Sequence, residues 1–191
     1  MPKPKTDSKE RLIEAASRLF AQQGYQATGL SQIVEESGAP RGSVYFLFPE
    51  GKEEIAVEAL KLSATRIRHL LQSTAESSDT VKDWIRRIAA SLAQSLEASA
   101  YRSGSPLAAV TLDGVDATSP SLGQACHRAY DAWIEDAAHL LQHKYGLDRA
   151  GAEKLAVSAI AAIEGAVILC RARKSTEPLA IVADQIAAWT P

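Results

Sequence analysis

Three short stretches with apolar residues three or four positions apart open the chain, which is the spacing of helices that bury one face. The first begins near Ser8 and ends at Gly24. The second ends at Gly38, because glycine readily takes the left-handed conformation that terminates many helices. Pro40 suits the first turn of a third helix, where a missing N–H costs nothing, and this helix ends near Phe48. The pattern predicts a bundle of three helices, the last two joined by a tight turn.

Longer periodic segments with clear ends follow this bundle. They cover residues 52–73, 81–96, a short apolar stretch within 98–119, and then 119–145, 148–173 and 176–188. Together with the first three helices they predict an all-α fold of about nine helices. We expect two domains: an N-terminal three-helix helix-turn-helix domain over 1–52, and a C-terminal helical domain over 53–191.

The tight turn between two short helices suggests DNA binding. In a helix-turn-helix, the second helix enters the major groove and its N-terminal residues meet the bases. Here the second helix carries, at or near its start, Arg41, Gly42, Ser43 and Tyr45. Lys52 opens the next helix, where its ammonium and the helix N-terminus both suit a phosphate. A solvated charge or a core aromatic is the simpler interpretation of any one of these residues, and for Phe48 we expect a core position. Their combination predicts DNA binding.

The motifs of the first sixty residues follow a recognisable order. The chain reads RLIEAASRLFAQQGYQATGLSQIVEESG, then PRGSVYFLF, then GKEEIAVEAL. A helix ends in a Gly-aromatic pair, Ile-Val precedes a Gly turn, and Gly-Ser-x-Tyr-x-x-Phe is followed by Lys-Glu. This combination resembles the TetR family of bacterial repressors. The segments GAPRGSVYFLFPEGKEE and YRSGSPLAAVTLD further resemble its LmrA/YxaF-like branch, whose members repress drug-efflux or related genes and release DNA on binding small aromatic molecules.

The resemblance implies roles for individual residues of the N-terminal helix-turn-helix domain, residues 1–52, which is called the head. The positions at which family members contact phosphates or enter the groove are here Thr28, Arg41, Gly42, Ser43, Tyr45, Phe46 and Lys52. Phe46 would touch a thymine methyl group or a sugar. Two departures weaken the pattern: Pro40 stands where many members have a serine cap, and Leu47 stands where many have a phosphate-binding histidine. Base reading by Ser43 and Phe46 is modest, which predicts that DNA shape contributes to recognition.

The resemblance also implies a ligand-binding C-terminal domain. The candidates for its pocket are mainly aromatic and apolar: Trp84, Tyr101, Leu107, Val110, Leu112, His127, Tyr130, Trp133, Ile163 and Glu164. Aromatic walls with few polar groups suit a small aromatic or hydrophobic molecule, which His127 and Glu164 would orient by hydrogen bonds. The same residues are equally typical of an ordinary hydrophobic core.

Small side chains surround the helix over 148–173, so that other helices can approach it closely. A tightly packed core helix would look the same. In TetR-like proteins the last two long helices pair with their two-fold mates in a four-helix bundle, which implies a homodimer. The interface candidates are Ala159, Ala162, Gly165, Ala166, Leu179, Val182 and Ile186. A dimer presents two heads to a palindromic operator in double-stranded DNA, which so small a head needs for useful affinity.

Charge and composition limit the remaining possibilities. Residues 1–52 hold seven Lys/Arg and six Asp/Glu, a net charge of +1, so the rest carries −3 of the total −2. The electrostatic contribution to DNA binding is therefore modest. Cys126 and Cys170 lack a CxxC pairing, which predicts two reduced, buried thiols. His139 and His143 are four apart on a helix without further ligands, so that we expect neither a metal nor another cofactor.

No signal peptide and no apolar run of about eighteen residues is evident, which predicts a cytoplasmic protein with no membrane partner. An all-helical enzyme would need a clustered acid, base or nucleophile, and 53–191 shows no such cluster. A DNA-binding regulator without a small ligand, acting as an activator or through a protein partner, remains the main alternative. We expect a ligand-released repressor of efflux or detoxification genes, and not an enzyme.

Overall fold

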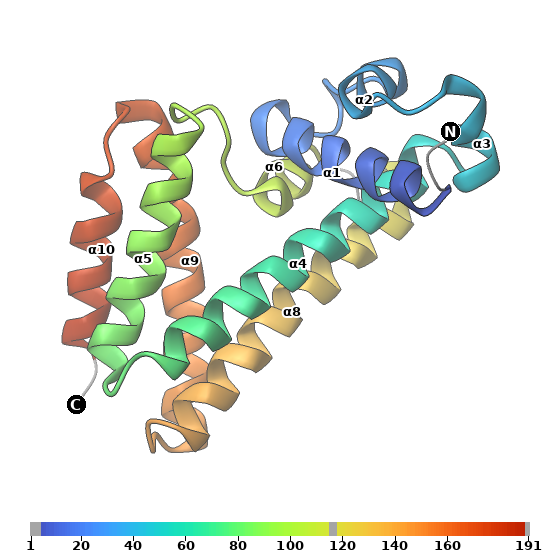
Figure 1. Ribbon diagram of the computed structural model, residues 1–191. Helices are drawn as coiled ribbons and strands as arrows, with labels where there is room; N and C mark the ends of the chain where they lie inside the picture. The colour runs from blue at the N-terminus through green and yellow to red at the C-terminus, as the bar shows by residue number, and fades with distance from the viewer. Residues whose placement is uncertain (1–4, 115–117, 190–191) are drawn as a thin grey trace. The chain divides into compact units, whose positions relative to one another are not determined.

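The computed structural model describes residues 5–114 and 118–189. Over these residues the structure is all-α, as predicted, with nine α-helices and one short 3-10 helix (Figure 1). The elements are α1 (Lys5–Gln23), α2 (Leu30–Ser37), η1 (Arg41–Ser43), α3 (Val44–Leu47), α4 (Lys52–Glu76), α5 (Val81–Ala98), α6 (Pro106–Leu112), α8 (Pro120–His143), α9 (Arg149–Arg173) and α10 (Glu177–Ala188).

The chain divides into two compact units, each built from segments that are far apart in the sequence. The first unit takes its described residues from 1–63 and 105–129, and the second from 64–104 and 130–191. This division differs from the predicted boundary after Lys52, because α6 belongs with the N-terminal helices and because α4 and α8 each continue from one unit into the other. The predicted functional domains, 1–52 and 53–191, stay a prediction.

The core of the first unit joins the three N-terminal helices to α4, α6 and α8. α1 packs against both α2 and α6. The largest fully buried side chains come from all of these elements: Leu12, Phe20, Ile33, Phe48, Ile55, Leu107 and Leu122. Phe48 has no exposed surface, so the prediction of a core position is confirmed. Burying these side chains supplies most of the stability of a bundle whose individual helices are short.

In the second unit, α10 lies antiparallel to α5 and packs on both α5 and α9 (Figure 1). Two side-chain contacts set the direction of the α5–α10 pair. Arg86 Nη2 lies 2.9 Å from Asp184 Oδ1, and the Thr176 hydroxyl donates to the Glu97 carboxylate at 3.4 Å. Ala183 and Ile186 of α10 are buried in the same cluster as the apolar face of α5.

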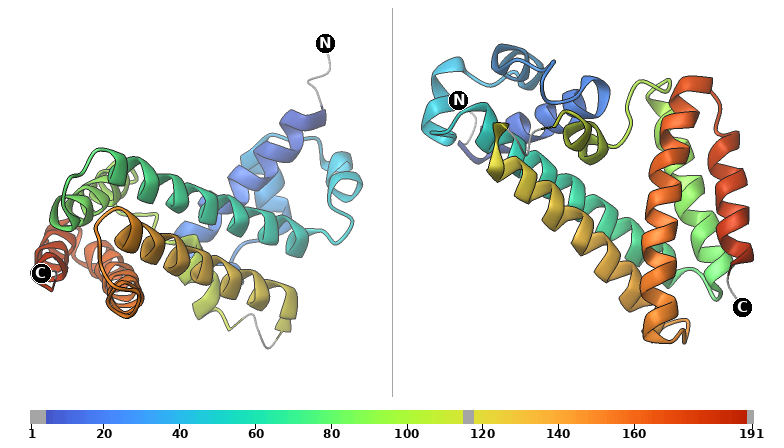
Figure 2. Two further views of the ribbon diagram at one scale, coloured as in Figure 1. Left: turned by 90° about the horizontal axis from the view of Figure 1, so that it is seen from below. Right: turned by 180° about the vertical axis from the view of Figure 1, so that it is seen from behind.

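α4 and α8 run side by side in the same direction (Figure 2). In the first unit Ser121 of α8 donates to the Glu53 carboxylate of α4. In the second unit Trp133 Nε1 donates to the Ala64 carbonyl at 3.3 Å, and Arg68 Nε bonds Asp136 Oδ2 at 2.6 Å. The contacts advance together along both helices, which is the signature of a parallel pair.

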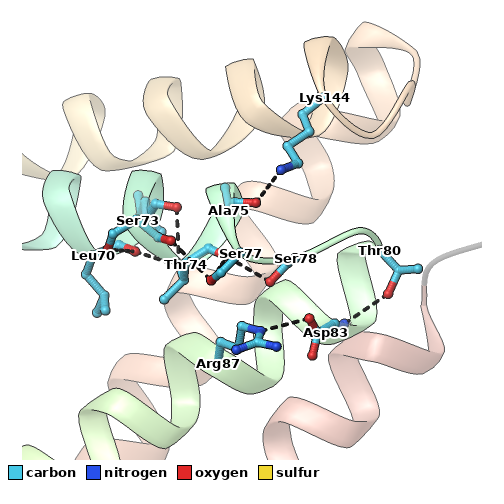
Figure 3. Close-up of polar contacts among 11 residues, drawn as sticks. Leu70, Ser73, Thr74, Ala75, Ser77, Ser78, Thr80, Asp83, Arg87 and Lys144 are labelled. Carbon is cyan, nitrogen blue, oxygen red and sulfur yellow. Dashed lines mark hydrogen bonds and ion pairs between the residues drawn. The ribbon is translucent and has the colours of Figure 1, made fainter.

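Hydroxyl groups mark the end of α4 (Figure 3). Thr74, Ser77 and Ser78 each donate to a backbone carbonyl three or four residues earlier. Lys144, the first residue after α8, donates to the Ala75 carbonyl in the last turn of α4. The Ser77 and Ser78 hydroxyls both reach the Thr74 carbonyl, which lies in the last turn of α4, where side-chain donors replace missing backbone partners. Thr80 then caps α5 by accepting from the backbone N–H of Asp83 at 3.2 Å.

α9 corrects one expectation from the sequence. It is long and apolar enough to cross a membrane by length and composition, although the sequence analysis expected no apolar run of that length. Only 28% of its most apolar window is buried within the chain. A core helix of a soluble protein can be equally long and apolar, but most of it is then buried. The uncovered part of α9 therefore needs another explanation.

Tyr145 contributes a ring to the core and a hydroxyl that finds no partner. Its ring stacks on Trp84 with the centroids 5.5 Å apart. The hydroxyl oxygen is buried and makes no hydrogen bond within the residues that the structure describes. Burial, followed by the negative charges of Asp83 and Asp79, raises the pKa of Tyr145 from 10.0 to about 12.

Replacing Tyr145 with Phe should therefore stabilise the protein. The stacked ring is kept and a buried, unpaired hydroxyl is removed, so we expect the free energy of unfolding to rise by about 1 kcal/mol at pH 7. Because the pKa in the folded state lies above the unfolded value, the wild type keeps its stability below pH 10 and loses part of it as the pH rises towards 12. Urea denaturation of both proteins at pH 7 and pH 11 measures this: the gap should widen at pH 11, and a constant gap contradicts the assignment.

Candidate nucleic-acid interface

The turn between α2 and η1 has the geometry that the sequence predicted. Gly38 is left-handed, with a φ of 60°, and its N–H bonds the Glu35 carbonyl. Pro40 takes the extended conformation at the N-cap, one position before the turn of helix in which it was expected. The next helix starts as the 3-10 turn η1 and continues as α3, and residues 41–47 together are called the recognition helix below.

Arg11 holds this turn from α1, a role that the sequence analysis missed. Its Nη1 donates to the carbonyls of Ser37 and Gly38 at 3.1 and 3.2 Å. These carbonyls lie at the C-terminus of α2, where a guanidinium is favoured both as a donor and as a positive charge. The only signal in the sequence is an arginine on the first helix, and such a residue is usually a solvated charge.

The recognition helix turns two large aromatic side chains towards solvent. Tyr45 is 68% exposed and Phe46 is 70% exposed, whereas Val44 is buried and anchors the helix. A core position, which is the simpler interpretation of a lone aromatic residue, is therefore wrong for Tyr45. Exposing two neighbouring aromatic rings is costly in water, so this face suits a partner that covers it.

The polar candidates of the recognition helix lie on its accessible side. Arg41 and Gly42 are exposed and Ser43 is partly exposed. A Cβ atom at Gly42 would meet nothing within 4 Å in the chain. The chain itself does not require a glycine at this position, which agrees with the predicted close approach of the backbone to a partner.

Lys52 and Thr28 are already engaged within the first unit. The Lys52 Nζ lies 3.9 Å from the centroid of the Tyr25 ring, which is a cation–π contact. Partial burial lowers the pKa of Lys52, and the charge of Asp113 opposes this shift. Thr28 is only 1% exposed, and its hydroxyl donates to the Gly24 carbonyl at 2.6 Å. A phosphate contact by the Thr28 hydroxyl remains a prediction, and it would require this turn to rearrange.

The pocket candidates fall into different environments. Leu107, Val110, Leu112 and His127 belong to the first unit, where Leu107 and Val110 are fully buried while Leu112 is 77% exposed and His127 is exposed. The other candidates belong to the second unit: Trp84, Tyr101, Tyr130, Trp133, Ile163 and Glu164. Trp84 donates from Nε1 to the Leu71 carbonyl at 3.0 Å and stacks on Tyr145, which gives it a structural role.

Tyr130 and Trp133 form an edge-to-face pair with their ring centroids 5.4 Å apart. Tyr101 takes a left-handed conformation with a φ of 59° and packs, like Ile163, against the small cluster around Cys170. Glu164 lies half-buried on α9. The assignment of these residues to a ligand pocket stays a prediction.

The interface candidates separate by exposure. Ala166, Leu179 and Ile186 are buried in the core of the second unit, so the prediction of a direct contact with a second subunit is wrong for these three. Ala159, Ala162 and Val182 are partly buried, and Gly165 is exposed. Over the described residues, no group of three or more His, Cys, Asp or Glu side chains is arranged to hold a metal ion.

Two family models match this chain, one over its N-terminal part and one over its C-terminal part. Residues 12–59 match the bacterial regulatory proteins of the tetR family, and residues 82–185 match the C-terminal domain of transcriptional regulators that are LmrA/YxaF-like. HTH-type transcriptional regulator YxaF of Bacillus subtilis (strain 168) is 34% identical over 180 residues, which cover 94% of this chain and 93% of the relative. HTH-type transcriptional regulator LmrA of the same strain is 34% identical over 173 residues, 91% of each chain.

A crystal structure of a TetR transcriptional regulator from Legionella pneumophila shares the fold, with a TM-score of 0.84, 20% identity and coverage of 100% of both chains. The helix-turn-helix and the exposed recognition helix define a DNA-binding transcriptional regulator. The chain belongs to the TetR family, and its C-terminal part is LmrA/YxaF-like.

Lys52→Ala tests the predicted phosphate contact. We expect weaker binding to every DNA sequence and a smaller salt dependence, by about one unit of slope for each head, because one released counterion is lost per phosphate. Lys61→Ala, the same charge change at an exposed position of α4, should leave the slope unchanged. Fluorescence anisotropy over a range of salt concentrations measures both. An unchanged slope for Lys52→Ala would remove this residue from the interface.

Proposed function

We propose that this protein is a homodimeric repressor that binds a palindromic operator in double-stranded DNA and is released by a small aromatic or hydrophobic inducer. The regulated genes would encode efflux or detoxification functions, because YRSGSPLAAVTLD resembles the branch with that role. Its place of action is the bacterial cytoplasm, where the DNA is. No cofactor or membrane partner enters this proposal.

The observation that carries the DNA-binding part is the exposed aromatic pair of the recognition helix. Tyr45 and Phe46 stand exposed on a helix that Val44 and Phe48 anchor in the core. A rigidly held, exposed helix loses little conformational freedom when it enters a groove. The Tyr45 hydroxyl suits a phosphate, and the Phe46 ring suits a thymine methyl group or a sugar.

The dimer is supported by the uncovered face of α9. Between Val157 and Ala172 its exposed positions recur at helical spacing and are small or apolar: Val157, Ser158, Ala161, Gly165, Ile168, Leu169 and Ala172. Ile181 and Trp189, at and just beyond α10, add exposed apolar surface to the same unit. Apolar surface of this extent marks an interaction site, and a second copy with its own apolar face explains it better than a lipid bilayer does in a DNA-binding protein.

The second unit offers the best-supported ligand residues. Tyr130 is partly exposed and forms an edge-to-face pair with the buried Trp133, and Glu164 brings a half-buried carboxylate to the same unit. Flat apolar molecules stack well on such rings, and a single acidic group would select for a donor on the ligand. Leu107 and Val110 fill the core of the first unit, and we do not retain them as ligand contacts.

Release of DNA would follow from a two-state equilibrium of the dimer. On a palindrome the two recognition helices must lie about 34–36 Å apart, or a multiple of that distance. α4 starts next to the recognition helix and continues into the second unit, so a ligand bound there could act on the head through one continuous helix. The ligand shifts the equilibrium only by its differential affinity for the two states.

A gel shift with DNA from just upstream of the gene tests the proposal, at about 0.1 M salt with nonspecific competitor. We expect a discrete protein–DNA complex, and we expect a subset of flat aromatic compounds to dissociate it. A complex that no compound dissolves would favour a regulator without a small ligand. No complex, followed by failure of a selection from random DNA sequences, would refute operator binding itself.

Gly165→Leu tests the dimer face. A Cβ at Gly165 meets nothing within 4 Å in the chain, so a larger side chain clashes only with a partner. Leucine also favours a helix interior by about 0.8–1 kcal/mol over glycine, so the subunit itself should not unfold. We expect sedimentation to show a monomer for Gly165→Leu. Gly165→Ala adds helix propensity with little bulk and should remain dimeric; an intact dimer in Gly165→Leu would contradict this face.

A further inference from the structure

The turn after α1 forms a small anion-binding nest. Gly24 is left-handed with a φ of 81°, and the backbone N–H groups of the next two residues point the same way. Tyr25 N and Gln26 N both donate to one carboxylate oxygen, Asp113 Oδ2, at 2.6 and 2.9 Å. Successive N–H groups after a left-handed residue are a common site for anions, and a carboxylate makes such bonds stronger than a neutral acceptor does.

Asp113 is poorly placed for the helix to which it belongs. It is the C-cap of α6, where the carbonyl ends of the helix disfavour a negative charge. α6 is also a helix of only seven residues that packs on α1. The negative charge of Asp113 is instead stabilised by the backbone N–H groups of Tyr25 and Gln26, which follow α1. Asp113 is the last residue of the segment YRSGSPLAAVTLD. The proposed ligand and DNA contacts do not involve it.

The fit at Gly24 is tight. A Cβ atom built on Gly24 would lie 2.8 Å from Asp113 Oδ2 and 3.2 Å from Oδ1. Glycine is therefore required twice at this position, once for the left-handed backbone and once for the approach of the carboxylate. The Gly-aromatic pair that ends the first helix has a physical reason in this contact.

The same turn carries side chains of the candidate interface. The Thr28 hydroxyl donates to the Gly24 carbonyl at 2.6 Å, so the start of α2 is tied to the nest. The Tyr25 ring lies under the Lys52 ammonium at 3.9 Å. Asp113 is close enough to act on Lys52 by its charge. A movement of Asp113 would therefore affect two elements of the head. It would affect α2 through the Thr28 hydrogen bond, and the start of α4 through Lys52.

We propose that Asp113 is a positioning residue for DNA binding, which holds the α1–α2 turn on α6 in the arrangement that binds operator. It touches no DNA itself. Its bonds to the Tyr25 and Gln26 amides restrict the turn before binding, so that less conformational freedom is lost on the operator. This inference rests on the DNA-binding part of the proposed function and is independent of the identity of any inducer.

Three variants of the full-length protein separate the parts of this contact. Asp113→Ala removes the acceptor and the charge. Asp113→Asn keeps an oxygen acceptor and removes the charge, and one oxygen accepts both bonds here. Glu135→Ala removes one negative charge at an exposed position of α8 in the second unit and is the matched control.

Hydrogen exchange without DNA tests the contact directly. We expect the amides of Tyr25 and Gln26 to exchange about tenfold faster or more in Asp113→Ala, and near the wild-type rate in Asp113→Asn and Glu135→Ala. Unchanged protection in Asp113→Ala would overturn the contact. This measurement does not depend on operator binding, so it remains informative if the proposed function fails.

Operator affinity and dissociation rate test the positioning role. Asp113→Ala should bind about tenfold more weakly, mainly through faster dissociation, with an unchanged salt slope. Its melting temperature should fall, because two charge-assisted hydrogen bonds are lost, but the protein should remain folded at the temperature of the binding assay. Asp113→Asn should restore affinity to within about threefold. Wild-type affinity in Asp113→Ala, with the two amides exchanging faster, would reduce the contact to a local structural one.

Gly24→Ala disrupts the same contact from the α1–α2 turn and leaves Asp113 in place. It tests the positioning role independently if Asp113→Ala folds poorly. Its Cβ pushes the carboxylate away, so it should weaken operator binding in the same direction. The double variant Gly24→Ala with Asp113→Ala should add little to Gly24→Ala alone, because both changes act on one contact. Full additivity of the two effects would contradict the proposal.

Discussion

The parallel pairing of α4 and α8 is the constraint on which the rest of the structure depends. Both helices continue from one compact unit into the other, and each unit binds them together separately. Ser121 bonds Glu53 in the first unit, while Arg68–Asp136 and the Trp133–Ala64 bond hold them in the second. α4 is one continuous helix from Lys52 to Glu76 whose residues belong to both units. Any signal between the two parts of the chain has a continuous path through its backbone.

The chemistry of the DNA-binding head relies on shape and exposure more than on charge. The whole chain carries a net charge of −2, so long-range attraction to DNA is weak. The head instead presents a short recognition helix whose aromatic residues are exposed and whose anchors are buried. Arg11 fixes the turn before that helix, and Asp113 is proposed to fix the turn before α2. In the proposed dimer, two heads would offset the small charge of each, which would link the uncovered face of α9 to the function of the head.

Prediction from the sequence succeeded where local geometry decides the structure. Gly38 ends α2 in the left-handed conformation as expected, Phe48 is buried, and the helices begin and end close to the predicted residues. It failed for Ala166, Leu179 and Ile186, which were expected at a dimer interface and lie in the core. α9 is small or apolar around its whole circumference, so periodicity alone gives no direction to its faces. For the same reason Leu107 and Val110 could not be separated from pocket residues before the packing of α6 was known.

The sequence by itself determined the fold class, the helix-turn-helix and the family, because these depend on glycine conformations, helix periodicity and a motif within sixty consecutive residues. Only the tertiary structure decided which face of α9 stays uncovered, which aromatic rings are exposed, and that Asp113 meets the amides of Tyr25 and Gln26 across 88 and 87 positions of the chain. Contacts between residues so distant in sequence leave no periodic trace, since they arise when helices pack and not when they form.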